Sequence, residues 1–156
     1  MRLLCLAVLL SLVGCTAAPE AADTVVYLVR HAEAEDDGTR DPALSARGQA
    51  RAERLAGHLG AVDAVYATPY RRTQGTAVPV AQASGVETVV VPIGEAGVPG
   101  YVADVEARVR ALPAGSVAVV VGHSNTTPQV AGALSGVEME NLNHDQYDRL
   151  FVVTFS

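Results

Sequence analysis

The hydrophobic pattern of the chain alternates between short apolar runs and longer amphipathic stretches. Residues 24–29 form a continuous run of β-branched and other apolar side chains, which is typical of a strand buried on both faces. The same pattern returns at 62–67, 86–93, 116–121 and 150–155 and predicts four more strands.

Two helices are predicted in the first half of the chain. Residues 45–59 are rich in Ala and Arg, with Ser45 placed to cap the helix and Gly60 placed to end it. Residues 71–83 predict a second helix, which Pro79 is expected to bend or shorten.

Two more helices are predicted in the second half. Apolar side chains recur every three or four residues over 99–112, which indicates an amphipathic helix. A last helix is predicted to have Thr127 as its N-cap and Pro128 at its first position, and to run to about residue 134 before Gly136. The alternation of strands and helices predicts an α/β layered fold with a largely parallel sheet.

Residues 1–14 predict a signal peptide. Arg2 gives a positive start, and the apolar run at 3–13 fits the roughly 7–15 residues of a signal-peptide core but is too short to span a bilayer. The segment ending at Cys15 resembles the bacterial lipobox, in which the cysteine is acylated and becomes the first mature residue. Residues 15–23 would then form a lipidated tether.

Lipidation of Cys15 would tether a domain at 24–156 to a membrane of the bacterial cell envelope, facing the periplasm or the exterior. The alternative is ordinary cleavage around Ala17 or Ala18, without an anchor. Because Cys5 leaves with the signal peptide and Cys15 is acylated, the folded domain contains no thiol. Disulfides, cysteine nucleophiles and cysteine metal ligands are therefore excluded.

Composition limits the partners of this domain. A chain of 156 residues with 49% apolar and 18% charged residues fits one folded domain rather than a disordered chain. All 11 basic residues are arginines, and 17 acidic residues give a formal charge of −6. No nucleic-acid binding is expected of such a chain. Any anion must be bound by a few arginines at specific positions.

Cationic and imidazole side chains follow three of the predicted strands. Arg30 and His31 follow the first strand, Arg71 and Arg72 come after the second, and His123 follows the fourth. Because ligands bind beyond the carboxyl ends of parallel strands, we expect these side chains to meet at one edge of the sheet. Arg72 also lies in the first turn of its helix, where free N–H groups favour an anion. A bound phosphate explains the cluster, since guanidinium groups pair with its oxygens and a neutral imidazole can attack phosphorus.

These side chains lie in segments that resemble the histidine phosphatase superfamily, which includes the phosphoglycerate mutases. Residues 28–33 are similar to its Arg-His-Gly-Glu signature, 42–50 to its Pro-Leu-Thr-x-x-Gly-x-Gln-Ala segment, 68–77 to its Ser-Pro-x-x-Arg-Ala-x-x-Thr-Ala helix start, 120–126 to its second-histidine segment, and 147–154 to the closing strand of small members. The ordered set covers nearly all of the predicted domain. The resemblance implies a three-layer α/β/α sandwich.

The resemblance also implies a mechanism. His31 would attack the phosphoryl group and become phosphohistidine, which requires a neutral ring whose other nitrogen is held by a hydrogen bond. Arg30, Arg72 and His123 would bind the phosphoryl oxygens, with Ser124 as a further phosphate ligand. Water would then release phosphate, without a metal or other cofactor.

The family commonly places a proton donor after the third strand, and Glu95 is the carboxylate there. The alternative for Glu95 is a solvated loop side chain, because the segment around it is short. Glu33 is expected to orient its loop, and Ala32, which replaces the signature Gly, is expected to be tolerated where φ is negative. Arg71 is expected on another face of its helix, at the rim or the surface.

Other polar residues have simpler explanations. His58 is predicted to lie on the surface of its helix. A metal site from His144, Asp145 and Asp148 is an alternative to a solvated loop before the last strand. The acidic run at 33–37 is expected to be solvated beside the phosphate site.

The leading hypothesis is a membrane-tethered phosphatase that acts on a phosphomonoester or a phosphohistidine, on a small molecule or a phosphoprotein. The size of the chain and the short segment after the third strand resemble the small phosphohistidine-phosphatase group. A phosphate-binding or interaction module without turnover is the alternative from another class. A phosphomutase is the remaining alternative, although short loops and the absence of lysine argue against it.

Overall fold

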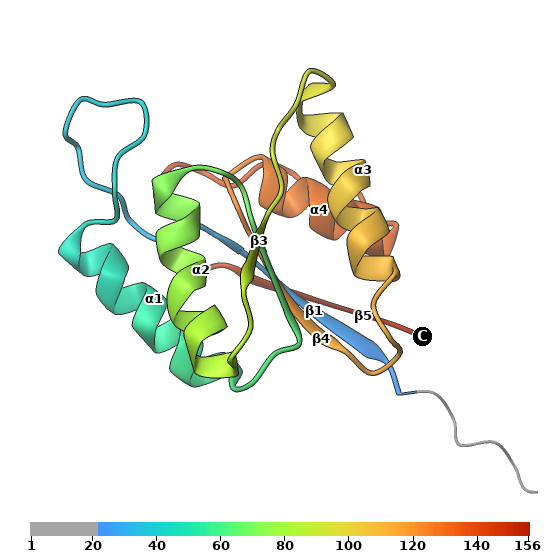
Figure 1. The fold of residues 1–156 in the computed structure, drawn as a ribbon. Coiled ribbons are helices and arrows are strands. Elements are labelled where there is room, and N and C mark those ends of the chain that lie inside the picture. Colours follow the sequence, from blue (N-terminus) through green and yellow to red (C-terminus); the bar gives the residue numbers. More distant parts are fainter. Residues whose placement is uncertain (1–21) are drawn as a thin grey trace, which may run out of the picture.

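Residues 22–156 are described by the structure, a computed structural model (Figure 1). In chain order the elements are β1 (Thr24–Arg30), α1 (Ala46–Leu59), β2 (Ala64–Ala67), α2 (Arg71–Ser84), β3 (Thr88–Val90), α3 (Gly97–Arg110), β4 (Val117–Gly122), α4 (Thr126–Ser135) and β5 (Leu150–Phe155). All nine predicted elements are present in the predicted order. The predicted signal peptide, the lipidation site Cys15 and most of the tether lie outside the described residues.

The five strands form one sheet in the order β3-β2-β4-β1-β5. The first four strands of that order run parallel, and β5 pairs antiparallel with β1. In the register between β1 and β4, Arg30 lies opposite Gly122, and Ala67 of β2 lies opposite Val121. The carboxyl ends of β1, β2 and β4 therefore lie side by side.

Helices cover both faces of the sheet, as predicted. On one face, α2 packs over β2 and β4, where Val65, Val119 and Val80 are fully buried, and α1 packs beside α2. On the other face, α3 and α4 pack together, and Tyr101 and Val105 of α3 reach the buried side chains of β1 and β4. Figure 1 shows the two helix pairs on opposite sides of the strands. The fold is a three-layer α/β/α sandwich with a largely parallel sheet.

The ends of several elements differ from the sequence prediction. The strand predicted at 62–67 begins at Ala64, and the strand predicted at 86–93 is reduced to Thr88–Val90. Because Pro92 has no N–H group, pairing cannot continue beyond Val91, whose N–H still donates to Ala67. The helix predicted at 99–112 spans Gly97–Arg110, and Pro79 is accommodated inside α2, which continues to Ser84.

The predicted N-cap of the last helix is wrong. Asn125 takes the N-cap position, so Thr127 is the second helical residue and Pro128 the third. The Thr127 hydroxyl donates instead to the backbone carbonyl of Val29, 3.1 Å away in β1. Ser45 and Gly60 do cap α1 as predicted, with Ser45 Oγ accepting from the N–H of Gly48.

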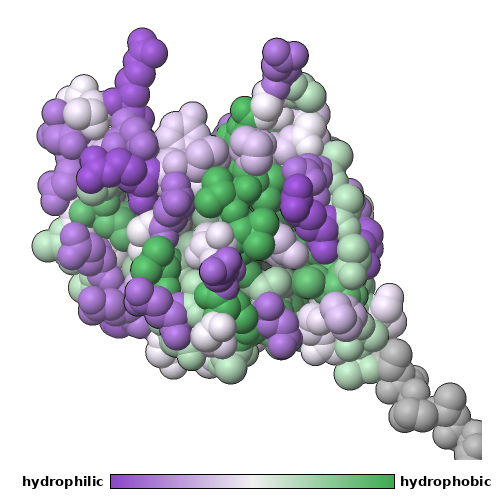
Figure 2. Space-filling model, in the orientation of Figure 1, coloured by the Kyte–Doolittle hydropathy of each residue, from purple (hydrophilic) through white to green (hydrophobic). Residues whose placement is uncertain are grey.

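The surface is mixed in polarity. Figure 2 shows hydrophobic surface in the middle of one face, where Figure 1 places the edge strand β3, and Val89 and Val90 of that strand are exposed. Polar surface covers the loop between β1 and α1, which contains the acidic residues Glu35, Asp36 and Asp37. Within residues 22–156, no helix is long and apolar enough to cross a bilayer.

Candidate active site

A cavity of about 390 Å³ opens where β1, β2 and β4 end. This strand-end cavity is lined by Arg30, His31, Tyr70, Arg72, Ile93, His123, Ser124 and Asn125. The prediction that Arg30, His31, Arg72 and His123 meet at one edge of the sheet is therefore confirmed. They meet because parallel neighbours present their carboxyl ends together, although the residues are up to 93 positions apart in sequence.

His31 is buried at the end of β1, directly beside this cavity. Its Nδ1 lies 2.8 Å from the carbonyl oxygen of Ala32. Because a carbonyl can only accept a hydrogen bond, Nδ1 carries the proton and Nε2 keeps its lone pair. Burial, together with the positive charges of Arg30 and Arg72, lowers the pKa of His31 to about 4. The ring is thus neutral at physiological pH, as a nucleophile on phosphorus requires.

Arg30 is 7% exposed and is held by the loop before β5. Its Nη1 donates to the carbonyls of Asn143 and His144, at 3.0 and 2.8 Å, and its guanidinium lies 4.0 Å from the centre of the Tyr147 ring. Its Nε is buried and has no hydrogen-bond partner among the described residues. The side chain is fixed by one nitrogen and retains N–H groups for an anion.

Arg72 reaches the cavity from the first turn of α2. Its guanidinium lies 4.6 Å from the centre of the Tyr70 ring and 3.7 Å from a carboxylate oxygen of Asp41. The neighbouring Arg71 is exposed and does not line the cavity, as its position on the helix predicted. The two adjacent arginines therefore have different surroundings.

His123 follows β4 and faces His31, with 5.4 Å between the ring centres. Its Nε2 is hydrogen-bonded to the hydroxyl of Thr68, 2.9 Å away. Burial lowers the pKa of His123 to about 3, and the charges of Arg72 and Arg30 contribute. Ser124 also lines the cavity, and its carbonyl accepts from the N–H of Leu142.

The loop after β1 is tied to α1 and α2. Glu33 receives two hydrogen bonds from Arg51, at 2.8 and 2.7 Å, and these bonds lower its pKa to about 2. The N–H of Ala32 donates to the Thr76 hydroxyl, 2.9 Å away. Ala32 has a negative φ, so the Gly of the family signature is not needed here.

Several predicted residues lie outside the cavity. Glu95 is exposed before α3 and does not line it, so its role as proton donor stays a prediction. His58 is exposed on α1, as predicted. Residues 22–156 contain no group of three His, Cys, Asp or Glu side chains that could hold a metal ion. The structure therefore does not support the alternative of a metal site at His144, Asp145 and Asp148.

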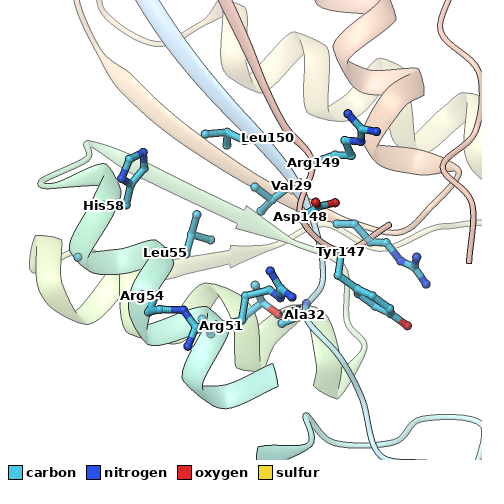
Figure 3. A pocket seen from close by; sticks show the side chains of 14 residues that line it. Val29, Ala32, Arg51, Arg54, Leu55, His58, Tyr147, Asp148, Arg149 and Leu150 are labelled. Carbon is cyan, nitrogen blue, oxygen red and sulfur yellow. Dashed lines mark hydrogen bonds between the residues drawn. The ribbon is translucent and has the colours of Figure 1, made fainter. Parts of the chain in front are cut away.

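A larger cavity of about 640 Å³ lies between α1 and the start of β5 (Figure 3). Its apolar lining includes Leu55 and Leu150, and Arg54 and Arg149 lie around it. Arg30 lines both cavities. Sequence patterns gave no signal for this cavity, or for Tyr70, Ile93 and Asn125 in the first one, because such contacts join distant segments.

Comparison with known proteins agrees with this geometry. The model of the histidine phosphatase superfamily (branch 1) matches residues 26–93, from the middle of β1 to the segment after β3. Residues 26–93 are therefore similar to the histidine phosphatase superfamily. Over 72 residues the chain is 40% identical to phosphoserine phosphatase 1 of Hydrogenobacter thermophilus, a match that covers 41% of this chain. The match covers 34% of that relative, so the two are alike over about a third of its length.

Two solved structures of assigned phosphohistidine phosphatases extend the likeness to most of the chain. SixA from Nakamurella multipartitia is 25% identical, with a TM-score of 0.56 and 86% of each chain covered. SixA from Agrobacterium tumefaciens is 27% identical, with a TM-score of 0.56, and the match covers 71% of this chain and 76% of that one.

Proposed function

We propose that this chain is a phosphatase that uses His31 as its nucleophile. The observation that carries the proposal is the hydrogen bond from His31 Nδ1 to the carbonyl of Ala32, which leaves Nε2 unprotonated beside two arginines and a second histidine. The match of residues 26–93 to the superfamily model and the likeness to phosphatases support it.

The reaction proceeds in two transfers. Nε2 of His31 attacks phosphorus, and the bond from phosphorus to the leaving group breaks with its electron pair going to that group. Arg30 and Arg72 stabilise the negative charge on the phosphoryl oxygens during this transfer. Water then attacks the phosphohistidine, loses a proton to solvent, and releases phosphate and neutral His31.

The cavity favours a substrate whose leaving group departs without a proton from a carboxylic acid. Among the described residues, no Asp or Glu lines the strand-end cavity. An alkyl alkoxide leaves poorly without general acid catalysis, which is worth about 10²–10⁴-fold in rate. The imidazole of a phosphohistidine leaves more readily because its P–N bond is weak. We therefore propose phosphohistidine, on a protein or a small molecule, as the preferred substrate class.

A substrate comparison tests this proposal. We expect hydrolysis of phosphohistidine and 4-nitrophenyl phosphate in the presence of a chelator, and phosphoserine hydrolysis at least ~100-fold slower. Glu95→Gln should leave all three rates within about twofold of the wild type, and Glu87→Gln is the matched exposed control. A selective loss of phosphoserine hydrolysis in Glu95→Gln would instead identify Glu95 as a proton donor. Phosphate binding without turnover of any substrate would favour the binding module.

We further propose that Cys15 carries a lipid that holds the domain on a membrane of the cell envelope. The apolar run before Cys15 and the small residue Gly14 support this reading of the sequence. Full-length Cys15→Ser, expressed in bacteria, should lose its lipid and move from the membrane to the soluble fraction, because its acyl chains provide the anchor. Cys5→Ser is the control, since it alters only the predicted signal peptide. Membrane association of Cys15→Ser equal to that of the wild type would refute the anchor.

A further inference from the structure

Two buried threonines link the start of α2 to His123. The Thr73 hydroxyl donates to the backbone carbonyls of Thr68 and Tyr70, at 2.9 and 2.8 Å. The hydroxyl oxygens of Thr68 and Thr73 are 2.8 Å apart, and that of Thr68 is 2.9 Å from His123 Nε2. Both threonines are fully buried. We call Thr68 and Thr73 the hydroxyl pair.

The protons in this chain of hydrogen bonds can be assigned. Each hydroxyl has one proton to donate. Thr73 gives its proton to a carbonyl, since the carbonyls of Thr68 and Tyr70 can only accept. Thr68 must then supply the proton between the two hydroxyls, which leaves its oxygen able only to accept from His123. His123 therefore carries its proton on Nε2.

Nδ1 of His123 is then the ring nitrogen that remains for a ligand. In a neutral ring with Nε2 protonated, Nδ1 has a lone pair and would repel a phosphoryl oxygen. It can donate to that oxygen only if the ring takes up a second proton. With the hydroxyl pair in place, His123 can therefore donate from Nδ1 to a bound phosphate only as the doubly protonated imidazolium. A neutral ring that carries its proton on Nδ1 is excluded.

We propose that Thr68 and Thr73 are positioning residues that fix His123 as the Nε2–H tautomer, so that phosphate binds with uptake of a proton at Nδ1. This inference rests on the proposed function of the strand-end cavity and goes beyond it by linking substrate binding to a proton.

The charges around His123 agree with such a linkage. The groups that face it are His31, Arg30, Arg72 and the edge-on ring of Tyr70. In the free protein, burial and the two guanidinium groups disfavour a charged ring. A bound dianion reverses this balance, because its charge lies on the same side as the arginines and attracts a proton to Nδ1.

The Thr73 hydroxyl decides this assignment. With Ala at position 73, the first hydroxyl would be free to donate to Nε2 and to place the proton of a neutral ring on Nδ1 instead. Thr73 removes that choice.

Nitrogen NMR of histidine in the free protein tests the tautomer directly. We expect protonated Nε2 and bare Nδ1 at His123 in the wild type and in Thr73→Ser. Thr73→Ala should shift the ring mainly to the Nδ1–H tautomer. Because both variants lack the γ-methyl group, their difference reports on the hydroxyl and not on packing. An unchanged tautomer in Thr73→Ala, or an Nδ1–H tautomer in the wild type, would overturn the proposal.

Tungstate binding tests the linkage, since this tetrahedral dianion does not itself titrate near neutral pH. Calorimetry in buffers of different ionisation enthalpy should show uptake of about one proton per tungstate by the wild type and Thr73→Ser, and affinity should fall about tenfold per pH unit above neutrality. Thr73→Ala should show far smaller uptake and a flatter profile. Binding of tungstate to the wild type without proton uptake would overturn the proposed role of the hydroxyl pair but not the phosphate site. Failure of tungstate to bind at all would count against both this proposal and the phosphate site, and the NMR result would still decide the tautomer.

Discussion

Replacing His31 by alanine is expected to lower kcat/KM for 4-nitrophenyl phosphate by at least ~10³-fold, because the variant has no nucleophile to accept the phosphoryl group. The wild type, mixed with a ³²P-labelled substrate and quenched in alkali, should carry label that is absent from His31→Ala. Retained affinity for tungstate and an unchanged circular dichroism spectrum would show that the variant is folded.

The matched control is His58→Ala, which removes an exposed imidazole from α1 and should leave the rate unchanged. The pH profile gives a second check. Since only the neutral ring attacks and the pKa of His31 is lowered to about 4, activity should persist at pH 5 and be lost as the pH falls through about 4. Wild-type activity in His31→Ala would refute the proposed nucleophile.

Gly48→Ala is expected to lower the free energy of unfolding by about 2–4 kcal/mol, the largest stability effect we predict for a single added methyl group. Gly48 is buried in the first turn of α1, where its Cα passes against the backbone of Glu33. A Cβ at this position would overlap the carbonyl oxygen of Glu33, and backbone cannot rotate away as a side chain can. The loop that follows His31 would have to move, so activity should fall as well.

Gly57→Ala in the same helix is the control. A Cβ there meets no atom within 4 Å, and alanine favours a helix over glycine by about 0.5–1 kcal/mol. We therefore expect Gly57→Ala to be slightly more stable than the wild type in urea denaturation, with full activity. Equal free energies of unfolding for Gly48→Ala and Gly57→Ala would show that the contact between Gly48 and the backbone of Glu33 leaves room for a methyl group.

Local patterns were sufficient for the elements of this fold. Apolar runs predicted all five strands, and Ser45 and Gly60 predicted both ends of α1, because these features depend on neighbours within a few residues. Predictions failed where distant groups compete for a residue. Thr127 looks like a cap in sequence, yet its hydroxyl is taken by the carbonyl of Val29, almost 100 positions away.

The catalytic candidates were predictable for a similar reason. Arg30 ends a strand and His31 and His123 each follow one, and parallel strands bring their carboxyl ends together whatever the intervening loops do. Glu95 also follows a strand, but that strand is the short edge strand β3, and the structure places Glu95 on the surface outside the strand-end cavity.

The sequence by itself determined the layered α/β architecture, the order of its elements and the arginines and histidines that gather at the end of the sheet. Hydrophobic periodicity and the direction of parallel strands are enough to fix these. Only the tertiary structure decided how the gathered side chains are held. Arg30 is fixed by carbonyls of the loop before β5, and His123 by the buried hydroxyl pair. Hydrogen bonds of this kind depend on atom positions to within a few tenths of an ångström, which follow from the packing of the whole domain rather than from any local pattern.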